Sequence, residues 1–123
     1  MELTDIKNDI RGTILKFKLG DQKFLVIFTN RGTLRAGELH NIEQHSFLIK
    51  GKMEVIMKVN NEDIRVDCVA HNHNAHLVIP KEVPHYFRFL EDSIMIENDD
   101  ENMTTAYYPE YRKLVEKSLI DSH

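Results

Sequence analysis

A carboxylate and an imidazole lie two residues apart in one strand-like segment of the chain. Side chains at positions i and i+2 of a strand point to the same face, so Glu38 and His40 are expected to converge on one point. A turn over residues 41–43 would bring the amide of Gln44 beside them. His85, in a second strand-like segment, offers another imidazole. These four side chains form the candidate site.

Two kinds of chemistry suit this group. Glu38, His40 and His85 supply two imidazoles and one carboxylate, the donor set that holds non-haem iron with open positions, and Gln44 could add a weak neutral oxygen. Proton abstraction beside a carbonyl needs instead a base whose pKa lies near the working pH. Burial raises the pKa of a carboxyl group, so Glu38 could be the base and His40 its acid partner. The alternative is a purely structural pair of Glu38 with Arg35 or His40.

The spacing of these residues resembles the first motif of the cupin family. That motif reads Gly, five residues, His-x-His, three or four residues, Glu, six residues, Gly. Its positions are occupied here by Gly32, Glu38, His40, Gln44 and Gly51. Glutamate therefore replaces the first histidine, and glutamine replaces the motif's glutamate.

The second cupin motif is matched in part. It reads Gly, five residues, Pro-x-Gly, two residues, His, three residues, Asn, and this chain keeps Pro80 and His85 at the proline and histidine positions. The resemblance covers about residues 31–97. It implies an all-β fold, the cupin double-stranded β-helix, which is an antiparallel jelly-roll barrel.

A narrower resemblance is to the sugar-nucleotide 3,4-ketoisomerases. The segment from Arg35 to His40, followed by Gln44 and Gly51, is similar to their Arg-Gly-x-His-Ala-His, then Gln, then Gly. In that family two histidines move protons beside the hexose carbonyl, and the arginine helps to hold the nucleotide phosphates. The resemblance implies the same roles for Arg35 and His40, with Glu38 replacing the first histidine.

Short alternating apolar runs dominate the chain to about residue 97, and they are separated by turn signals rich in glycine and asparagine. The expected strands cover residues 13–19, 22–29, 33–40, 44–50, 53–59, 62–69, 75–79, 85–89 and 93–97. After an acidic connector, the apolar spacing predicts a C-terminal α-helix over about residues 109–121. We expect a single domain, residues 1–123, with a barrel core over about 12–98 and the helix packed outside it.

Composition limits the class of partner. The net charge is −4, and no stripe of Lys and Arg interleaves with aromatic residues, which argues against a nucleic-acid partner. The single cysteine, Cys68, excludes an internal disulfide. Without a signal peptide or a long apolar run, the expected location is the cytoplasm, with no membrane partner.

Two strands are apolar on both faces, in residues 24–28 and 47–49. Such strands must be covered on both faces. The C-terminal helix can cover one sheet, and a second subunit is the natural cover for the other, which predicts a homodimer. The alternative is a monomer in which residues 1–11 fold back over that sheet.

The remaining reactive residues favour structural roles. His71, His73 and His76 are expected in a surface turn, because Asn and His tolerate the backbone angles of turns. His45 should point away from Gln44, and Cys68 is expected to be a buried apolar residue.

Three hypotheses for function remain open. The leading one is an isomerase or epimerase of a sugar or sugar nucleotide that needs no metal and uses Glu38 and His40 as its acid/base pair. The substrate-binding residues would be Arg35, Gln44, His85 and Phe87. The second is a metal-dependent, dioxygenase-like cupin. Its Fe, Mn or Zn ligands would be Glu38, His40 and His85, with or without Gln44. The third is a non-catalytic ligand-binding or regulatory cupin, because one fold hosts many functions.

Overall fold

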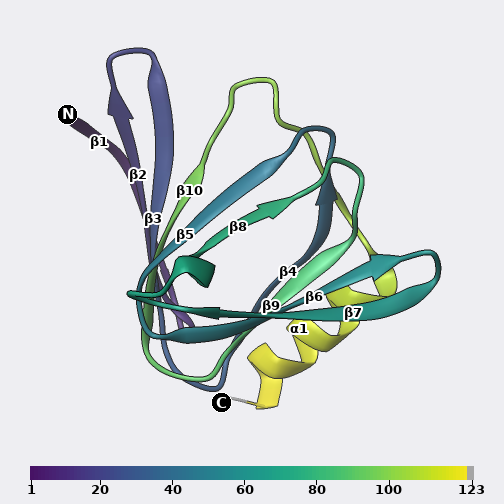
Figure 1. The fold of residues 1–123 in the computed structure, drawn as a ribbon. Coiled ribbons are helices and arrows are strands. Elements are labelled where there is room, and N and C mark those ends of the chain that lie inside the picture. Colours follow the sequence, from purple (N-terminus) through teal and green to yellow (C-terminus); the bar gives the residue numbers. More distant parts are fainter. Residues whose placement is uncertain (122–123) are drawn as a thin grey trace.

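Two antiparallel β-sheets face each other, and one helix packs on the outside (Figure 1). The computed structural model describes residues 1–121. The elements in chain order are β1 (Glu2–Asp9), β2 (Gly12–Leu19), β3 (Gln22–Thr29), β4 (Leu34–His40), β5 (Gln44–Lys50), β6 (Lys52–Val59), β7 (Glu62–Val69), a 3-10 turn (His73–Ala75), β8 (His76–Ile79), β9 (His85–Phe89), β10 (Ser93–Asn98), β11 (Thr105–Tyr107) and α1 (Pro109–Asp121). This arrangement confirms the predicted all-β jelly roll with a C-terminal helix.

The strand order gives each sheet its membership. One sheet has six strands in the order β1-β2-β3-β10-β5-β8, and the other has five in the order β11-β4-β9-β6-β7. Consecutive strands form tight hairpins where the turn residues allow left-handed backbone angles. Asn60 and Asn61, between β6 and β7, have φ angles of 52° and 64°, the conformation of a two-residue hairpin turn.

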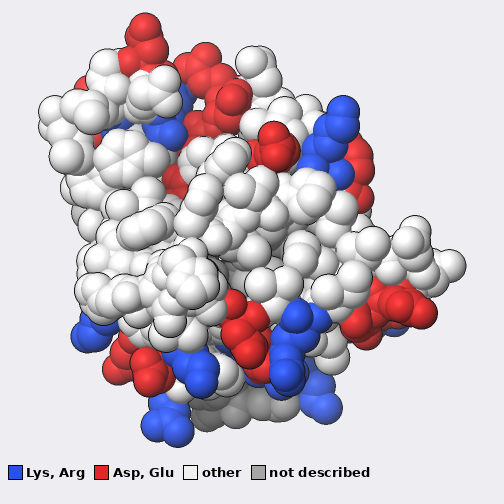
Figure 2. Space-filling model, viewed as in Figure 1, with Lys and Arg blue, Asp and Glu red and all other residues white. Residues whose placement is uncertain are grey.

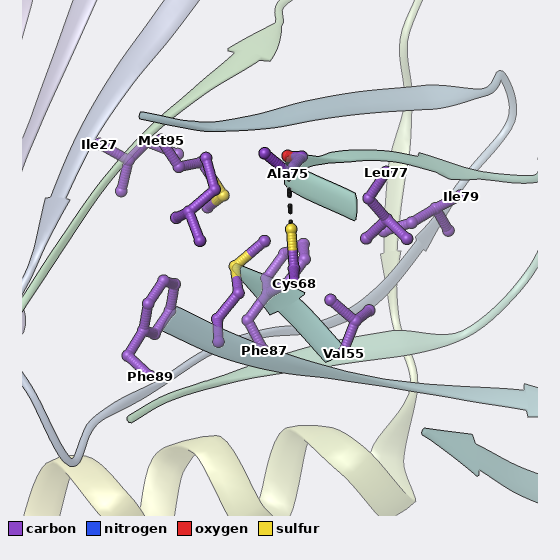
Figure 3. Close-up of a cluster of buried hydrophobic side chains, with 11 residues drawn as sticks. Ile27, Val55, Cys68, Ala75, Leu77, Ile79, Phe87, Phe89 and Met95 are labelled. Carbon is purple, nitrogen blue, oxygen red and sulfur yellow. Dashed lines mark hydrogen bonds between the residues drawn. The ribbon is translucent and has the colours of Figure 1, made fainter. Parts of the chain in front are cut away.

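The main core lies between the two sheets. Inward positions of both sheets supply it, because alternate residues of a strand face the same side (Figure 3). Its buried members are Ile27, Leu48, Met53, Val55, Cys68, Ala75, Leu77, Ile79, Phe87, Phe89 and Met95. The Cys68 thiol donates a hydrogen bond to the Ala75 carbonyl oxygen at 3.3 Å, which ties β7 to the turn before β8.

Helix α1 covers the outer face of the five-stranded sheet (Figure 1). Tyr111 and Val115 are fully buried there against Ile56 and Tyr86, which occupy the strand positions that point away from the main core. The helix therefore sits behind β4 and β9, the strands that carry Glu38 and His85. No helix among residues 1–121 is long and apolar enough to cross a membrane.

The N-terminal segment extends the six-stranded sheet as its edge strand. All eight residues of β1 are exposed, and the strand pairs only with β2. Strand β1 therefore extends the edge of the sheet. The monomeric alternative required this segment to fold over the outer face of the sheet, and it does not.

Candidate functional site

A cavity of about 400 Å³ lies between the two sheets and collects most of the predicted site residues. Side chains from β4, β5, β9 and β10 line it, together with residues from the N-terminal hairpin and from the chain before α1. The predicted residues on its wall are Arg35, Glu38, His40, Gln44 and Phe87. His85 is not part of that wall.

A β-bulge in β4 aims Glu38 into the cavity. The register between β4 and β9 shifts between Ala36 and Glu38, and Ala36 and Gly37 both have positive φ angles, of 75° and 80°. Helix α1 and the residue just before it stabilise this bulge. Tyr108 N–H donates to the Gly37 carbonyl at 2.9 Å, and Arg112 Nη1 donates to the Ala36 carbonyl at 2.9 Å. The bulge and the helix thus position the carboxylate together.

Glu38 and His40 form a close pair. Glu38 Oε2 lies 3.6 Å from His40 Nε2, and the other ring nitrogen, Nδ1, lies 3.0 Å from Thr105 Oγ1 on β11. Burial raises the pKa of Glu38 above its ordinary value, although His40 and Arg112 act in the opposite direction. A carboxylate with a raised pKa next to an imidazole is suited to moving a proton.

His85 lies behind the cavity wall. It is fully buried, its ring centroid is 5.4 Å from that of His40, and its Nδ1 donates to the Val83 carbonyl at 3.0 Å. Burial lowers the pKa of His85 to about 4, so the ring is neutral at pH 7. It can support His40 and Phe87 by packing, and its contacts provide no direct access to a ligand in the cavity.

Arg35 brings a buried positive charge to the cavity wall. Its Nε donates to Thr29 Oγ1 at 2.7 Å and its Nη2 to the Phe28 carbonyl at 3.3 Å. It forms no salt bridge within the described part of the chain, and burial lowers its pKa to about 10, with Arg11 adding repulsion. A buried guanidinium without a directly bonded carboxylate favours an anionic ligand.

Two groups of the cavity, Glu97 and Thr105, were not among the residues predicted from the sequence. Glu97, on β10, lines the wall and accepts a long hydrogen bond of 3.5 Å from Ser46 Oγ, which in turn accepts one of 3.3 Å from Gln44 Nε2. Burial raises the pKa of Glu97 to about 8. The second group, Thr105, belongs to a strand that was not predicted. Glu97 has a signal in the sequence: it alternates with Ser93 and Met95, both buried, on the inward side of β10.

His71, His73, His45 and Cys68 lie where expected, whereas His76, expected in the surface turn, is the first residue of strand β8. His71 and His73 are exposed in the turn before β8, and His71 has a φ angle of 63°. His45 points to the outer face of the six-stranded sheet and stacks on His76, with ring centroids 5.7 Å apart. Cys68 is buried, and burial raises the pKa of its thiol to about 11, which makes it a poor nucleophile.

The candidate metal ligands do not converge. Within residues 1–121, no three of the His, Cys, Asp and Glu side chains form a group that could hold a metal ion. Glu38 and His40 face one another, whereas the Nε2 atom of His85 is buried without a hydrogen-bond partner and His85 does not line the cavity. This arrangement does not fit the predicted set of two imidazoles and one carboxylate.

We therefore expect added Mn²⁺, or removal of metal with EDTA, to change the melting temperature by less than about 1 °C, because only a bound ion stabilises the folded state by mass action. Differential scanning fluorimetry measures this. A saturable rise that is lost in His85→Ala but kept in His73→Ala, a control in the exposed turn, would contradict the geometry.

No protein-family model and no curated protein sequence matches this chain. Solved structures do. Oxalate decarboxylase from Bacillus subtilis at pH 4.6 superposes with a TM-score of 0.69 and 16% sequence identity, over 85% of this chain and 30% of that one. Another structure of that enzyme is described by its Mn(II) centres, and it matches with a TM-score of 0.67 and 14% identity over 81% of this chain and 28% of that one.

A second protein shares the architecture. The capsular polysaccharide assembling protein CapF from Staphylococcus aureus superposes with a TM-score of 0.67 and 21% identity, over 86% of this chain and 34% of that one. This chain thus spans about a third of the length of these proteins. At such low identity the likeness shows the fold, and together with the two facing sheets it establishes that this chain has the cupin fold.

Proposed function

We propose that this chain is an enzyme that moves a proton beside the carbonyl group of a small anionic ligand, with an isomerase or epimerase of a sugar nucleotide as the leading candidate. The observation that carries the proposal is the pair of Glu38 and His40, 3.6 Å apart in the cavity wall, with burial raising the pKa of Glu38. A base of this kind has a pKa closer to neutral pH than an exposed carboxylate has.

The other cavity residues support an anionic ligand with a sugar-like ring. Arg35 and Arg11 line one part of the cavity, and a guanidinium is suited to bidentate contact with phosphate. Phe87 offers an apolar surface, and Gln44 offers a neutral hydrogen-bonding group. CapF is named for the assembly of a polysaccharide, which agrees with a carbohydrate ligand.

Proton removal would proceed within this pair. Glu38 takes the proton from the carbon next to the carbonyl group, and the electron pair of that bond moves toward the carbonyl oxygen to form an enediolate. His40 lies within hydrogen-bonding distance of Thr105, and it orients the Glu38 carboxylate and can relay the proton. Return of the proton to the neighbouring carbon, or to the other face of the same carbon, completes an isomerisation or an epimerisation.

Hydrogen exchange with the solvent tests the proposal. A nucleoside-diphosphate hexulose incubated with the protein in heavy water should gain deuterium at the carbon next to the ketone. The free hexulose should exchange far more slowly, because it lacks the phosphates that Arg35 would hold. If no member of a panel of nucleotide sugars binds or exchanges, the isomerase proposal is wrong and a non-catalytic ligand-binding role replaces it.

We also propose that a second copy of the chain covers the outer face of the six-stranded sheet. Large apolar side chains are exposed there, including Phe47 at 50%, Phe28 at 39% and Val78 at 38%. A mainly apolar hollow of about 440 Å³ adjoins Phe47 and Phe24. In Figure 2, uncharged side chains cover much of the left side of the molecule, where Figure 1 places this sheet.

The size of this face is sufficient for a dimer. Six strands about 4.8 Å apart and about 20 Å long form a face of about 600 Å² per subunit. Two such faces bury about 1,200 Å², which is the lower limit for a specific interface. A two-fold axis lets one apolar face cover its own copy, whereas helix α1 already covers the other sheet.

Phe47→Glu is expected to convert the dimer to a monomer and to raise its dissociation constant by about 100-fold or more, because the interface would then bury an unpaired charge. Size-exclusion chromatography with light scattering measures this. Leu114→Glu, an exposed position on α1, is the control and should leave the dimer intact. A wild-type protein that is monomeric under the same conditions would contradict the proposal.

A further inference from the structure

Glu97 and Glu38 face the same cavity from opposite sheets. Glu97 lies on β10 in the six-stranded sheet, Glu38 lies on β4 in the five-stranded sheet, and both side chains line the cavity wall. A ligand in this space therefore has one carboxyl group on each side. No metal-binding role explains the second carboxyl group, since the described residues offer no group of three metal ligands.

The surroundings of Glu97 hold its carboxyl group in a defined place. Ser46 donates the long hydrogen bond to Glu97 Oε1, and Gln44 Nε2 in turn donates a hydrogen bond to Ser46 Oγ. From β4, Glu38 repels it and Arg35 attracts it, but burial is the largest influence and keeps its pKa raised. The other charged or titratable groups on the cavity wall are Lys7, Arg11, His40, Asp99, Tyr107 and Arg112.

We propose that Glu97 is a further catalytic residue, which donates a proton to the carbonyl oxygen of the ligand while Glu38 removes the proton from the adjacent carbon. The inference rests on the proposed function and adds the acid that this function needs. An enolate that forms without a proton donor carries a full negative charge on oxygen, and a positioned acid removes this charge as it develops.

The steps balance without any other reactant. Glu38 takes the proton of the carbon–hydrogen bond, the electron pair of that bond forms the carbon–carbon double bond, and the carbonyl oxygen takes the proton of Glu97. The product is an enediol between a protonated Glu38 and a Glu97 carboxylate. In the second half, Glu97 removes the proton of the other enediol hydroxyl group, and Glu38 returns its proton to the carbon that was the carbonyl carbon. Both residues then regain their starting states.

Glu97→Gln is the first test. The amide keeps the size of the side chain and can still donate a hydrogen bond, but it cannot transfer a proton. For the nucleoside-diphosphate hexulose, kcat should fall by about 100-fold or more, and KM should change by less than about threefold. Ile96→Val, a change on the outer face of the same strand, is the control. Equal kcat values for wild type and Glu97→Gln would overturn the proposal.

The second test needs no substrate. Carbon-13 labelling of the glutamate carboxyl groups should reveal one resonance that is missing in Glu97→Gln and that titrates in the wild type at about pH 8. In Glu38→Gln this midpoint should move to lower pH, because the repelling charge is gone. A Glu97 midpoint near the ordinary value for glutamate would overturn the proposal, since the carboxyl group would then carry no proton at neutral pH.

The two tests separate the inference from the proposed function. If the wild type exchanges no hydrogen with any nucleotide sugar, the isomerase function fails, and the carbon-13 titration still decides whether Glu97 holds a proton opposite Glu38. If the wild type is active and Glu97→Gln is equally active, the function stands and the role of Glu97 is refuted. Melting temperatures of both variants within a few degrees of the wild type show that a loss of activity does not reflect unfolding.

Discussion

Glu38→Gln is expected to lower the rate of hydrogen exchange at the carbon next to the carbonyl group by about 100- to 10,000-fold, the usual contribution of a positioned general base. The amide has the shape of the carboxylate and cannot accept the proton. Since Arg35, Gln44 and Phe87 remain on the cavity wall, binding of the nucleotide sugar should change little. Nuclear magnetic resonance of the ligand in heavy water measures the exchange, and isothermal titration calorimetry measures the binding.

Glu43→Gln is the matched control for this variant. Glu43 is an exposed carboxylate in the turn between β4 and β5, close in sequence to Glu38 but outside the cavity wall. It should exchange hydrogen at the wild-type rate. If Glu38→Gln instead loses binding and exchange together, Glu38 holds the ligand and is not the base.

The pH dependence of the exchange follows from the two raised pKa values. Glu38 must be deprotonated to act as a base, so the rate should rise as pH increases through its pKa, which burial places above the ordinary value. Glu97 must be protonated to act as an acid, so the rate should fall as pH increases through about 8. The expected profile is bell-shaped, and these limits belong to the interacting pair of carboxyl groups.

The strands of the fold were predictable because their alternation is strong. Each of the nine predicted strands is present with ends displaced by no more than one residue, and the helix covers the predicted residues. A residue pattern of period two fixes which side chains face inward, and the change to helical spacing after residue 101 marks the helix. The resemblance to the cupin motifs pointed to the same architecture.

Two strands were missed for different reasons. β1 (Glu2–Asp9) mixes apolar with charged and polar residues, and all of it is exposed, so it has no buried face to produce a pattern. β11 (Thr105–Tyr107) is only three residues long and forms because it pairs with Glu38–His40 of β4, a contact between segments far apart in the chain. Such long-range pairing leaves no local signal.

The site was predictable where its residues lie close together in the sequence. Glu38 and His40 share strand β4, and Gln44 begins β5 in the opposite sheet only four residues later, so the structure places all three around one cavity. The position of His85 behind the wall depends on how β9 packs against β4, which motif spacing does not specify. Glu97 lies in the opposite sheet from Glu38, and the two residues line the same cavity only because the two sheets pack face to face.

Gly37→Ala is expected to reduce the free energy of unfolding by about 3 kcal/mol. This loss is the sum of two costs: holding a residue with a Cβ in a left-handed backbone conformation, and a steric clash in a packed interface. Gly37 has a φ angle of 80°, and an added Cβ would lie 2.8 Å from Arg112 Cα, in the backbone of helix α1. The helix must shift to relieve this contact. Denaturant unfolding measures the change.

Gly20→Ala separates the two causes of this loss. Gly20 also has a positive φ angle, of 60°, but an added Cβ would meet nothing within 4 Å. Gly20→Ala should therefore reduce the free energy of unfolding by about 1 kcal/mol, the cost of the left-handed backbone conformation alone. Because the Gly37 bulge also aims Glu38, Gly37→Ala should slow hydrogen exchange as well, whereas Gly20→Ala should not. Equal losses of stability in the two variants would mean that the helix does not hold the bulge, and another contact would then have to position the carboxylate.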